Sequence, residues 1–143
     1  MTADPAAEAF SFPVRVYWED TDAGGVVYHA QYLAFMERAR TEWMCALGLG
    51  QELLRARDDL LFVVRSMNLD FRAPARLDDQ LAVTAVLIEC RGASLVMGQR
   101  IQRGDTLLVE AQVRIGVLAA SSFRPRPLPA ALKSELKSLL EKP

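Results

Sequence analysis

Residues 30–47, with the sequence AQYLAFMERARTEWMCAL, carry the pattern that decides the fold. Apolar side chains recur there every three or four residues, which places them on one stripe of an α-helix. The stripe consists of Tyr32, Met36, Ala39, Trp43 and Ala46. Gly48 is well placed to end the helix, and a short second helix is expected over residues 51–57. The sequence therefore predicts one long amphipathic helix with a buried face.

Strand patterns surround this helix. Residues 14–18 are rich in β-branched and aromatic side chains. Four more strand patterns follow the helix, at residues 61–71, 80–90, 95–103 and 107–118. Tight Gly-containing turns at 91–93 and 103–105 join the last three of them. This order predicts an α+β fold with an antiparallel sheet of about five strands wrapped around the helix. Residues 81–88 are apolar on both faces, so we expect a partner subunit to cover part of the face opposite the helix.

Length and composition are typical of one globular domain. The chain has 143 residues, and its 17 basic and 18 acidic side chains give a net charge of −1, which argues against a nucleic acid partner. We expect residues 1–11 to be an N-terminal extension and residues 124–143 a Pro-rich tail with a short helix. The first residues lack the features of a signal peptide, and the apolar runs are too short to span a membrane. A cytoplasmic protein is expected.

Residues 19–29 hold the groups best suited to chemistry. They contain three carboxylates, a Gly pair and the only histidine of the chain, His29. No Ser, Thr, Asp or Asn stands immediately before the helix, so its first backbone amides are free to stabilise an oxyanion. A carboxylate beside such amides and the apolar residues 26–28 has the parts needed for hydrolysis. A solvated acidic loop, or Asp20 or Asp22 folding back as a cap, stays open as an alternative.

Other chemistries fit the sequence less well. One histidine cannot supply a metal site of two or three histidines, and we expect neither a metal nor a cofactor. The sequence lacks the GxSxG motif of serine hydrolases and the glycine-rich motifs that bind nucleotide phosphates. Cys45 and Cys90 are expected to be small core residues, not nucleophiles.

The segment YWEDTDAGGVVYH, residues 17–29, closely resembles the hotdog-fold thioesterases, and above all the Tol–Pal-associated acyl-CoA thioesterases of the YbgC type. A more distant resemblance is to the 4-hydroxybenzoyl-CoA thioesterases. The similarity runs from about residue 14 to residue 128, and it includes residues 35–42, 73–79 and 91–96. Several motifs in the same order make this resemblance specific.

This resemblance implies a function and a set of site residues. Asp22 would be catalytic, either as the nucleophile that attacks the thioester of an acyl-CoA or as the general base that activates water. His29 would assist it, and the backbone amide near His29 would polarise the carbonyl. The remaining substrate contacts are expected from Gly24, Gly25 and Tyr28 in the loop, from Val63, Val64 and Arg65 on a strand, and from Arg91 and Ser94, which would hold CoA phosphates.

Three alternatives stay open beside this reading. A second hotdog subgroup carries its catalytic carboxylate on the long helix, where this chain has Glu37 and Glu42. A dehydratase or hydratase of 3-hydroxyacyl thioesters would use a similar carboxylate and histidine pair. A non-catalytic module would bind acyl thioesters or acyl carrier protein. The resemblance also implies a homodimer with shared active sites, often paired into a tetramer, while CoA enters as part of the substrate and the acyl group stays undetermined.

Overall fold

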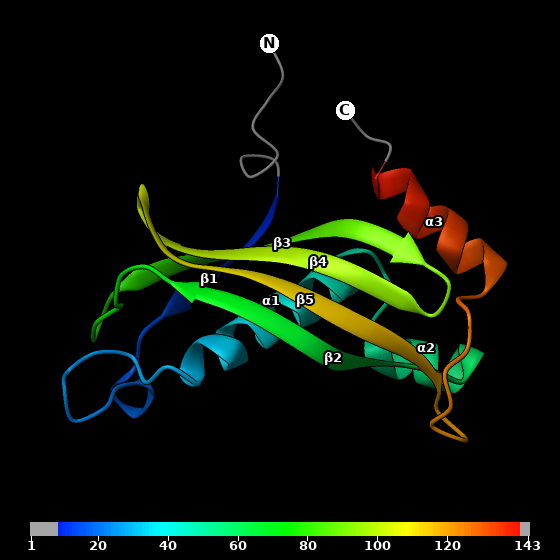
Figure 1. Ribbon diagram of the computed structural model, residues 1–143, viewed down its shortest axis with the longest axis horizontal. Coiled ribbons are helices and arrows are strands. Elements are labelled where there is room, and N and C mark those ends of the chain that lie inside the picture. Colours follow the sequence, from blue (N-terminus) through cyan, green and yellow to red (C-terminus); the bar gives the residue numbers. More distant parts are fainter. Residues whose placement is uncertain (1–8, 141–143) are drawn as a thin grey trace, which may run out of the picture.

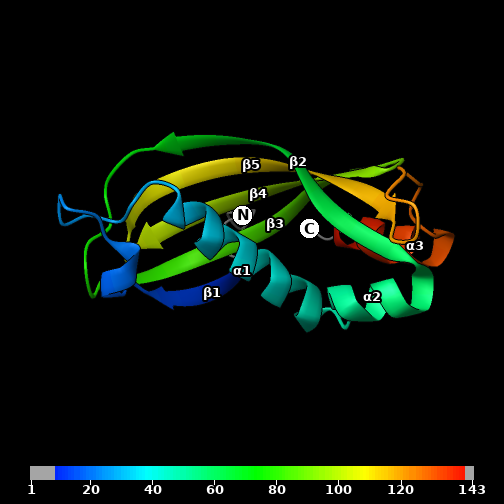
Figure 2. The same ribbon diagram turned by 90° about the horizontal axis from the view of Figure 1, so that it is seen from below.

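The computed structural model describes residues 9–140 as an α+β fold in which a five-stranded antiparallel sheet curves over one long helix (Figures 1 and 2). The strands are β1 Phe10–Arg15, β2 Leu60–Phe71, β3 Gln80–Arg91, β4 Ser94–Arg103 and β5 Thr106–Ala119. The helices are α1 Gln31–Ala46, α2 Gln51–Asp58 and α3 Ala130–Leu140, with a single 3-10 turn, η2, at Trp18–Asp20. Residues 1–8 of the predicted extension and residues 141–143 of the predicted tail lie outside the described residues.

The sheet has the strand order β1-β3-β4-β5-β2, so β1 and β2 are its edges. All neighbouring strands are antiparallel, as the sequence predicts. The two predicted tight turns are present, and Gly92 and Gly104 take φ values of 57° and 58°, which glycine adopts without the penalty of a side chain. The four strands and the helix predicted after residue 30 are confirmed.

The predicted strand over residues 14–18 is wrong at both ends. The strand begins at Phe10 and ends at Arg15. The chain then turns at Trp18–Asp20, where the amide of Tyr17 donates to Oδ2 of Asp20 at 2.8 Å and the amide of Asp20 donates to the carbonyl of Tyr17 at 3.0 Å. These local hydrogen bonds override the strand preference of the two aromatic residues.

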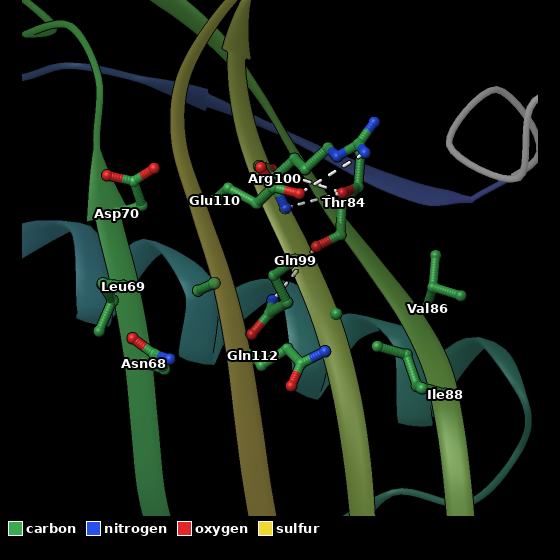
Figure 3. Close-up of a pocket in the computed structure, with 12 residues that line it drawn as sticks. Asn68, Leu69, Asp70, Thr84, Val86, Ile88, Gln99, Arg100, Glu110 and Gln112 are labelled. Atoms are coloured by element: carbon green, nitrogen blue, oxygen red, sulfur yellow. Dashed lines mark hydrogen bonds and ion pairs between the residues drawn. The ribbon is translucent and has the colours of Figure 1, made fainter.

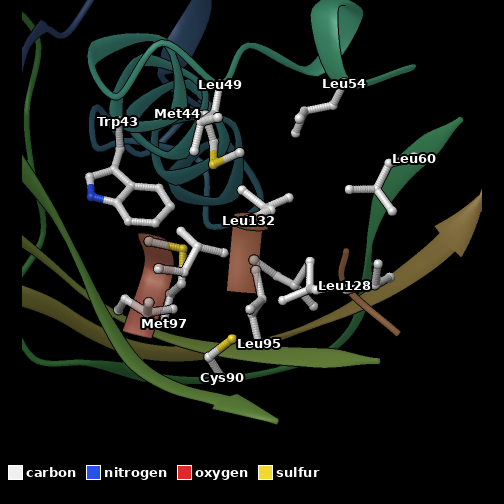
Figure 4. Packing of buried hydrophobic residues seen from close by; sticks show 14 of the residues in the cluster. Trp43, Met44, Leu49, Leu54, Leu60, Cys90, Leu95, Met97, Leu128 and Leu132 are labelled. Carbon is white, nitrogen blue, oxygen red and sulfur yellow. The ribbon is translucent and has the colours of Figure 1, made fainter. Parts of the chain in front are cut away.

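The core lies between α1 and the inner face of the sheet. The first half of α1 buries Tyr32, Phe35 and Met36 against β1, β3 and β5. The second half buries Trp43 and Met44 beside α2, α3 and the far ends of the strands (Figure 4). The helical stripe is thus confirmed, except that Ala46 is exposed at the end of the helix.

The two cysteines differ from each other. Cys90 is buried in the core, where burial raises the pKa of its thiol. Cys45 is exposed, so the prediction that it is a core residue is wrong. It lies on the side of α1 that turns away from the sheet, one position after the buried Met44.

Candidate active site

Asp20 fixes the loop that precedes α1. Its side chain is 4% exposed and accepts two hydrogen bonds of 2.8 Å, one from the amide of Tyr17 and one from Nε2 of Gln31 in the first turn of α1. Its carbonyl accepts a hydrogen bond from the amide of Tyr28 at 2.9 Å. Asp20 therefore ties both arms of the loop to the start of the helix. From the sequence, Asp20 was predicted only as a possible cap of the helix.

Asp22 lies at the exposed tip of this loop. Its amide donates to the carbonyl of Val26, and the amide of Gly25 donates to the carbonyl of Asp22, which makes a tight turn. Oδ1 of Asp22 accepts a hydrogen bond of 2.8 Å from the amide of Gly24. Gly25 has a φ of +79°, a conformation in which any other residue except Asn or Asp is strained. The loop thus holds the Asp22 side chain by one oxygen and leaves the carboxylate open to solvent.

His29 lies directly before α1. Its ring packs against the ring of Tyr28 with a centroid distance of 4.5 Å, and both side chains are exposed. Ala30 supplies no side-chain cap to the helix, as expected. Among the described residues, the backbone amides of His29 and Ala30 have no protein acceptor, whereas the amide of Gln31 donates to the carbonyl of Tyr28. Two amides at the start of α1 are therefore available to an oxyanion.

The hollow beside Asp22 is open to solvent. It is lined by Trp18, Glu19, Thr21, Asp22 and Ala23. The Trp18 ring is 83% exposed, although its carbonyl accepts hydrogen bonds from the amide and the hydroxyl of Thr21. The chain thus provides the carboxylate, but this hollow does not enclose an acyl group.

The predicted site residues Arg91, Ser94 and Val63 lie towards the end of the sheet opposite the loop. Arg15, just before the loop, pairs with Gln80 at one end of β3, and Arg91 is at the other end of that strand, about 35 Å away at the usual rise per residue. Ser94 and Val63 are in register with each other through Gly116 of β5. Within the chain, the structure therefore does not bring Arg91, Ser94 and Val63 to Asp22.

A cavity of about 300 Å³ lies on the inner side of β2, between this strand and the second half of α1. Val63 and Val64 of the predicted site line it, together with the apolar residues Trp43, Met44, Phe62, Leu95, Met97 and Ile115. Its polar lining comes mainly from Glu37, Arg40, Thr41 and Gln51. Arg65 lies at a β-bulge on the other side, with its aliphatic chain packed over Gly116. Of the residues that line this cavity, the sequence predicted Val63 and Val64 as substrate contacts and offered Glu37 as an alternative catalytic carboxylate, but it gave no indication of Arg40.

A second groove, of about 470 Å³, crosses the outer face of the sheet (Figure 3). Arg100 and Glu110 form an ion pair of 3.6 Å there, and Ile88, which is 46% exposed, belongs to the strand that is apolar on both faces. No predicted site residue lines this groove. The expected partner subunit on this face stays a prediction.

The part of the chain that the structure describes, residues 9–140, lacks metal-binding clusters and helices that could span a membrane. Within that range, no three His, Cys, Asp or Glu side chains are grouped so that they would hold a metal ion. No helix in the same range combines the length and the apolar character that a membrane crossing requires.

Comparison with known proteins places this loop and sheet in a family. Residues 16–136 match the model of the thioesterase-like superfamily. The chain is 49% identical over 129 residues to the acyl-CoA thioester hydrolase YbgC of Escherichia coli O6:H1, covering 90% of this chain and 96% of that protein. The chain belongs to the YbgC family of hotdog-fold thioesterases.

Other members and neighbours agree with this placement. The acyl-CoA thioesterase YbgC of Haemophilus influenzae is 43% identical over 91% of this chain and 96% of its own length. A probable thioesterase from Bartonella henselae, 40% identical, superposes with a TM-score of 0.79 over 83% of this chain and 98% of that chain. A 1,4-dihydroxy-2-naphthoyl-CoA thioesterase from Synechocystis, 25% identical, gives a TM-score of 0.82 over 94% and 99% of the two chains. The expected hotdog fold is thereby confirmed.

Proposed function

We propose that this YbgC-family protein hydrolyses the thioester of an acyl-CoA to a free acid and CoA, with Asp22 as the catalytic residue. The observation that carries this assignment is the loop itself. It presents an exposed carboxylate at its tip, and its base is tied by Asp20 to the start of α1, where the amides of His29 and Ala30 are free. The names of the YbgC relatives support the same reaction.

Two routes fit the carboxylate of Asp22. As a nucleophile, its free oxygen attacks the thioester carbon, the C–S bond breaks, and water then hydrolyses the resulting anhydride. As a general base, it takes a proton from a water molecule that attacks the same carbon. In both routes negative charge builds up on the carbonyl oxygen, and the amides of His29 and Ala30 would stabilise it. In both routes the sulfur leaves as a thiolate and takes up a proton, for which His29 is the adjacent donor.

The active site would form between two copies of the chain. Edge strand β2 is twelve residues long and contains no proline, whereas edge strand β1 has six residues and includes Pro13. A long edge with unpaired backbone groups favours pairing with another strand, and proline at an edge opposes it. We therefore infer an antiparallel pairing of β2 with β2 of a partner subunit.

This pairing would unite the separated groups of predicted site residues. It places the end of one β2 beside the beginning of the other. Phe71, at the end of β2, packs against Tyr32 at the start of α1, with a centroid distance of 5.7 Å. The catalytic loop of the partner subunit would then approach Val63 and Val64 and the cavity behind them. Asp22 and His29 of the partner subunit would face the acyl group, while Arg65, Arg91 and Ser94 would bind the CoA portion.

Thiol release tests the reaction. The purified protein is incubated with acyl-CoAs of increasing chain length, and free CoA is measured with a thiol reagent. We expect turnover of at least one acyl-CoA and no hydration of the matching enoyl-CoA. Hydration without thiol release would support the dehydratase or hydratase, and binding without either reaction would support the non-catalytic module.

Mixed dimers test the shared site. Asp22→Asn removes the carboxylate, and Val64→Trp fills the cavity of its own protomer, because Val64 pairs with the core residue Ile115 whereas Val63 lies over Gly116 on the other face. If each site combines two protomers, a mixed dimer regains one site with both elements intact and one with neither. Mixing the two inactive variants should therefore restore activity to a fraction of the molecules. No recovery in mixed dimers verified by mass would contradict a shared site. A tetramer, an acyl carrier protein partner and a cytoplasmic location stay predictions.

A further inference from the structure

Arg40 is an unusual residue in the cavity between α1 and β2. It projects from α1 among mainly apolar side chains and is only partly exposed. Its Nη1 donates a hydrogen bond of 2.9 Å to Oε1 of Gln99. Among residues 9–140, no carboxylate lies within ion-pair distance of Arg40, although Glu37 lies one helical turn away. A guanidinium has five N–H donors, so most of those on Arg40 remain available.

Gln99 of β4 fixes the position of the Arg40 guanidinium. Its side chain is 1% exposed, and its Nε2 donates to the carbonyl of Thr84 at 3.2 Å (Figure 3). The same Nε2 donates to the carbonyl of Met36 at 3.0 Å. Both hydrogens of the amide are thereby used, which fixes the direction of Oε1 towards Arg40. Helix α1 and strands β3 and β4 thus orient the guanidinium together.

The electrostatics of the cavity favour an anionic or oxygen-bearing guest. Burial lowers the pKa of Arg40, and the negative charge of Glu37 opposes that shift only in part. An arginine nevertheless stays charged at physiological pH, and no carboxylate offsets the free-energy cost of its partial desolvation. A carboxylate of a ligand would supply the missing partner through short, charge-assisted hydrogen bonds.

We propose that this cavity receives the acyl group and that Arg40 selects acyl groups with a carboxylate at their far end, as in the CoA monothioesters of short dicarboxylic acids. This role rests on the proposed function. The cavity volume of about 300 Å³ leaves room for a five-carbon acyl group. The apolar side chains Trp43, Phe62 and Met97 would surround its methylene groups, and Arg40 would bind its terminal carboxylate.

A matched substrate pair tests this selectivity. Glutaryl-CoA and pentanoyl-CoA share a five-carbon acyl chain and differ in a terminal carboxylate against a methyl group. We expect the wild type to have the higher kcat/KM for glutaryl-CoA. Arg40→Met should lower the ratio of the two kcat/KM values about ten- to a hundredfold, the usual range for loss of a hydrogen bond to a charged group. The control Arg38→Met, on the exposed side of α1, should leave the ratio unchanged.

Glu37→Gln should have the opposite effect. It removes the negative charge near the bound carboxylate, so the kcat/KM for glutaryl-CoA relative to that for pentanoyl-CoA should rise. If circular dichroism shows that Arg40→Met does not fold, the test uses Arg40→Lys, which keeps the charge, and Glu37→Gln. The ratio of the kcat/KM values for glutaryl-CoA and pentanoyl-CoA is then measured in these two variants. An equal loss on both substrates in the Arg40 variants, or a wild type that prefers pentanoyl-CoA, would overturn the role of Arg40 while thioester hydrolysis stands. Release of thiol from no acyl-CoA would instead refute the proposed function.

Discussion

Asp20 and Asp22 lie two residues apart, yet the structure predicts that only Asp20 supports the fold. Replacing Asp20 by Ala leaves the amide of Tyr17 and the Nε2 of Gln31 without their acceptor. Each unpaired donor costs about 1–3 kcal/mol if it stays buried, and partial access to water reduces this, so we expect a loss of about 2–4 kcal/mol in the free energy of unfolding. Domains of this kind have about 5–15 kcal/mol in total. Asp20→Asn keeps one acceptor oxygen and should cost about half as much.

The assay is urea denaturation followed by far-UV circular dichroism, at one fixed protomer concentration because association shifts the midpoint. Asp22→Asn is the matched control. Its side chain is exposed and accepts a single hydrogen bond, so we expect its unfolding free energy to stay within about 1 kcal/mol of the wild type. If Asp20→Ala is as stable as Asp22→Asn, the assignment of Asp20 as the anchor of the catalytic loop is refuted.

The structure supports three further predictions. Burial alone would raise the pKa of Asp79, but hydrogen bonds from the amide of Arg76 and from Arg103 lower it overall. The contribution of Asp79 to stability should therefore be present above about pH 4 and be lost as the pH falls below that value. In denaturation measured at each pH, Asp79→Asn should reduce this loss of unfolding free energy at acid pH. Ser66 lies at the middle of β2 and would face Ser66 of the partner subunit in the inferred dimer, so Ser66→Glu would place like charges opposite each other and should shift sedimentation towards the monomer. Ser134→Glu on α3 is the control, and a dimer unchanged by Ser66→Glu would argue against pairing through β2. Gly25→Ala forces a side chain into a positive φ and should cost about 1 kcal/mol in thermal unfolding; an unchanged melting temperature would mean that the turn rearranges easily.

Most of the fold was predictable because its elements follow local rules. The apolar stripe of α1 ends at a glycine, and the last three strands alternate with short glycine turns. The turn at Trp18–Asp20 was missed because it depends on a side chain that hydrogen-bonds to the backbone three residues earlier. The strand preference of two adjacent aromatic residues gives the opposite indication.

The site was predictable only in part. The loop residues are adjacent in the sequence, so their grouping at the start of α1 follows from the motif. The contact of Arg40 with Gln99 joins residues 59 positions apart, and no local pattern indicates it. The separation of Asp22 from Arg91 also required the structure, because it depends on the direction in which each strand runs.

The most direct test of Asp22 as the catalytic residue is the kcat of Asp22→Asn, measured by thiol release from the best acyl-CoA substrate. The amide has nearly the same shape as the carboxylate but can neither attack the thioester carbon nor take a proton from water. We expect a loss of at least about a thousandfold, consistent with removal of a nucleophile or general base, while the circular dichroism spectrum stays that of the wild type. A variant that turns over within a few fold of the wild type would contradict the account.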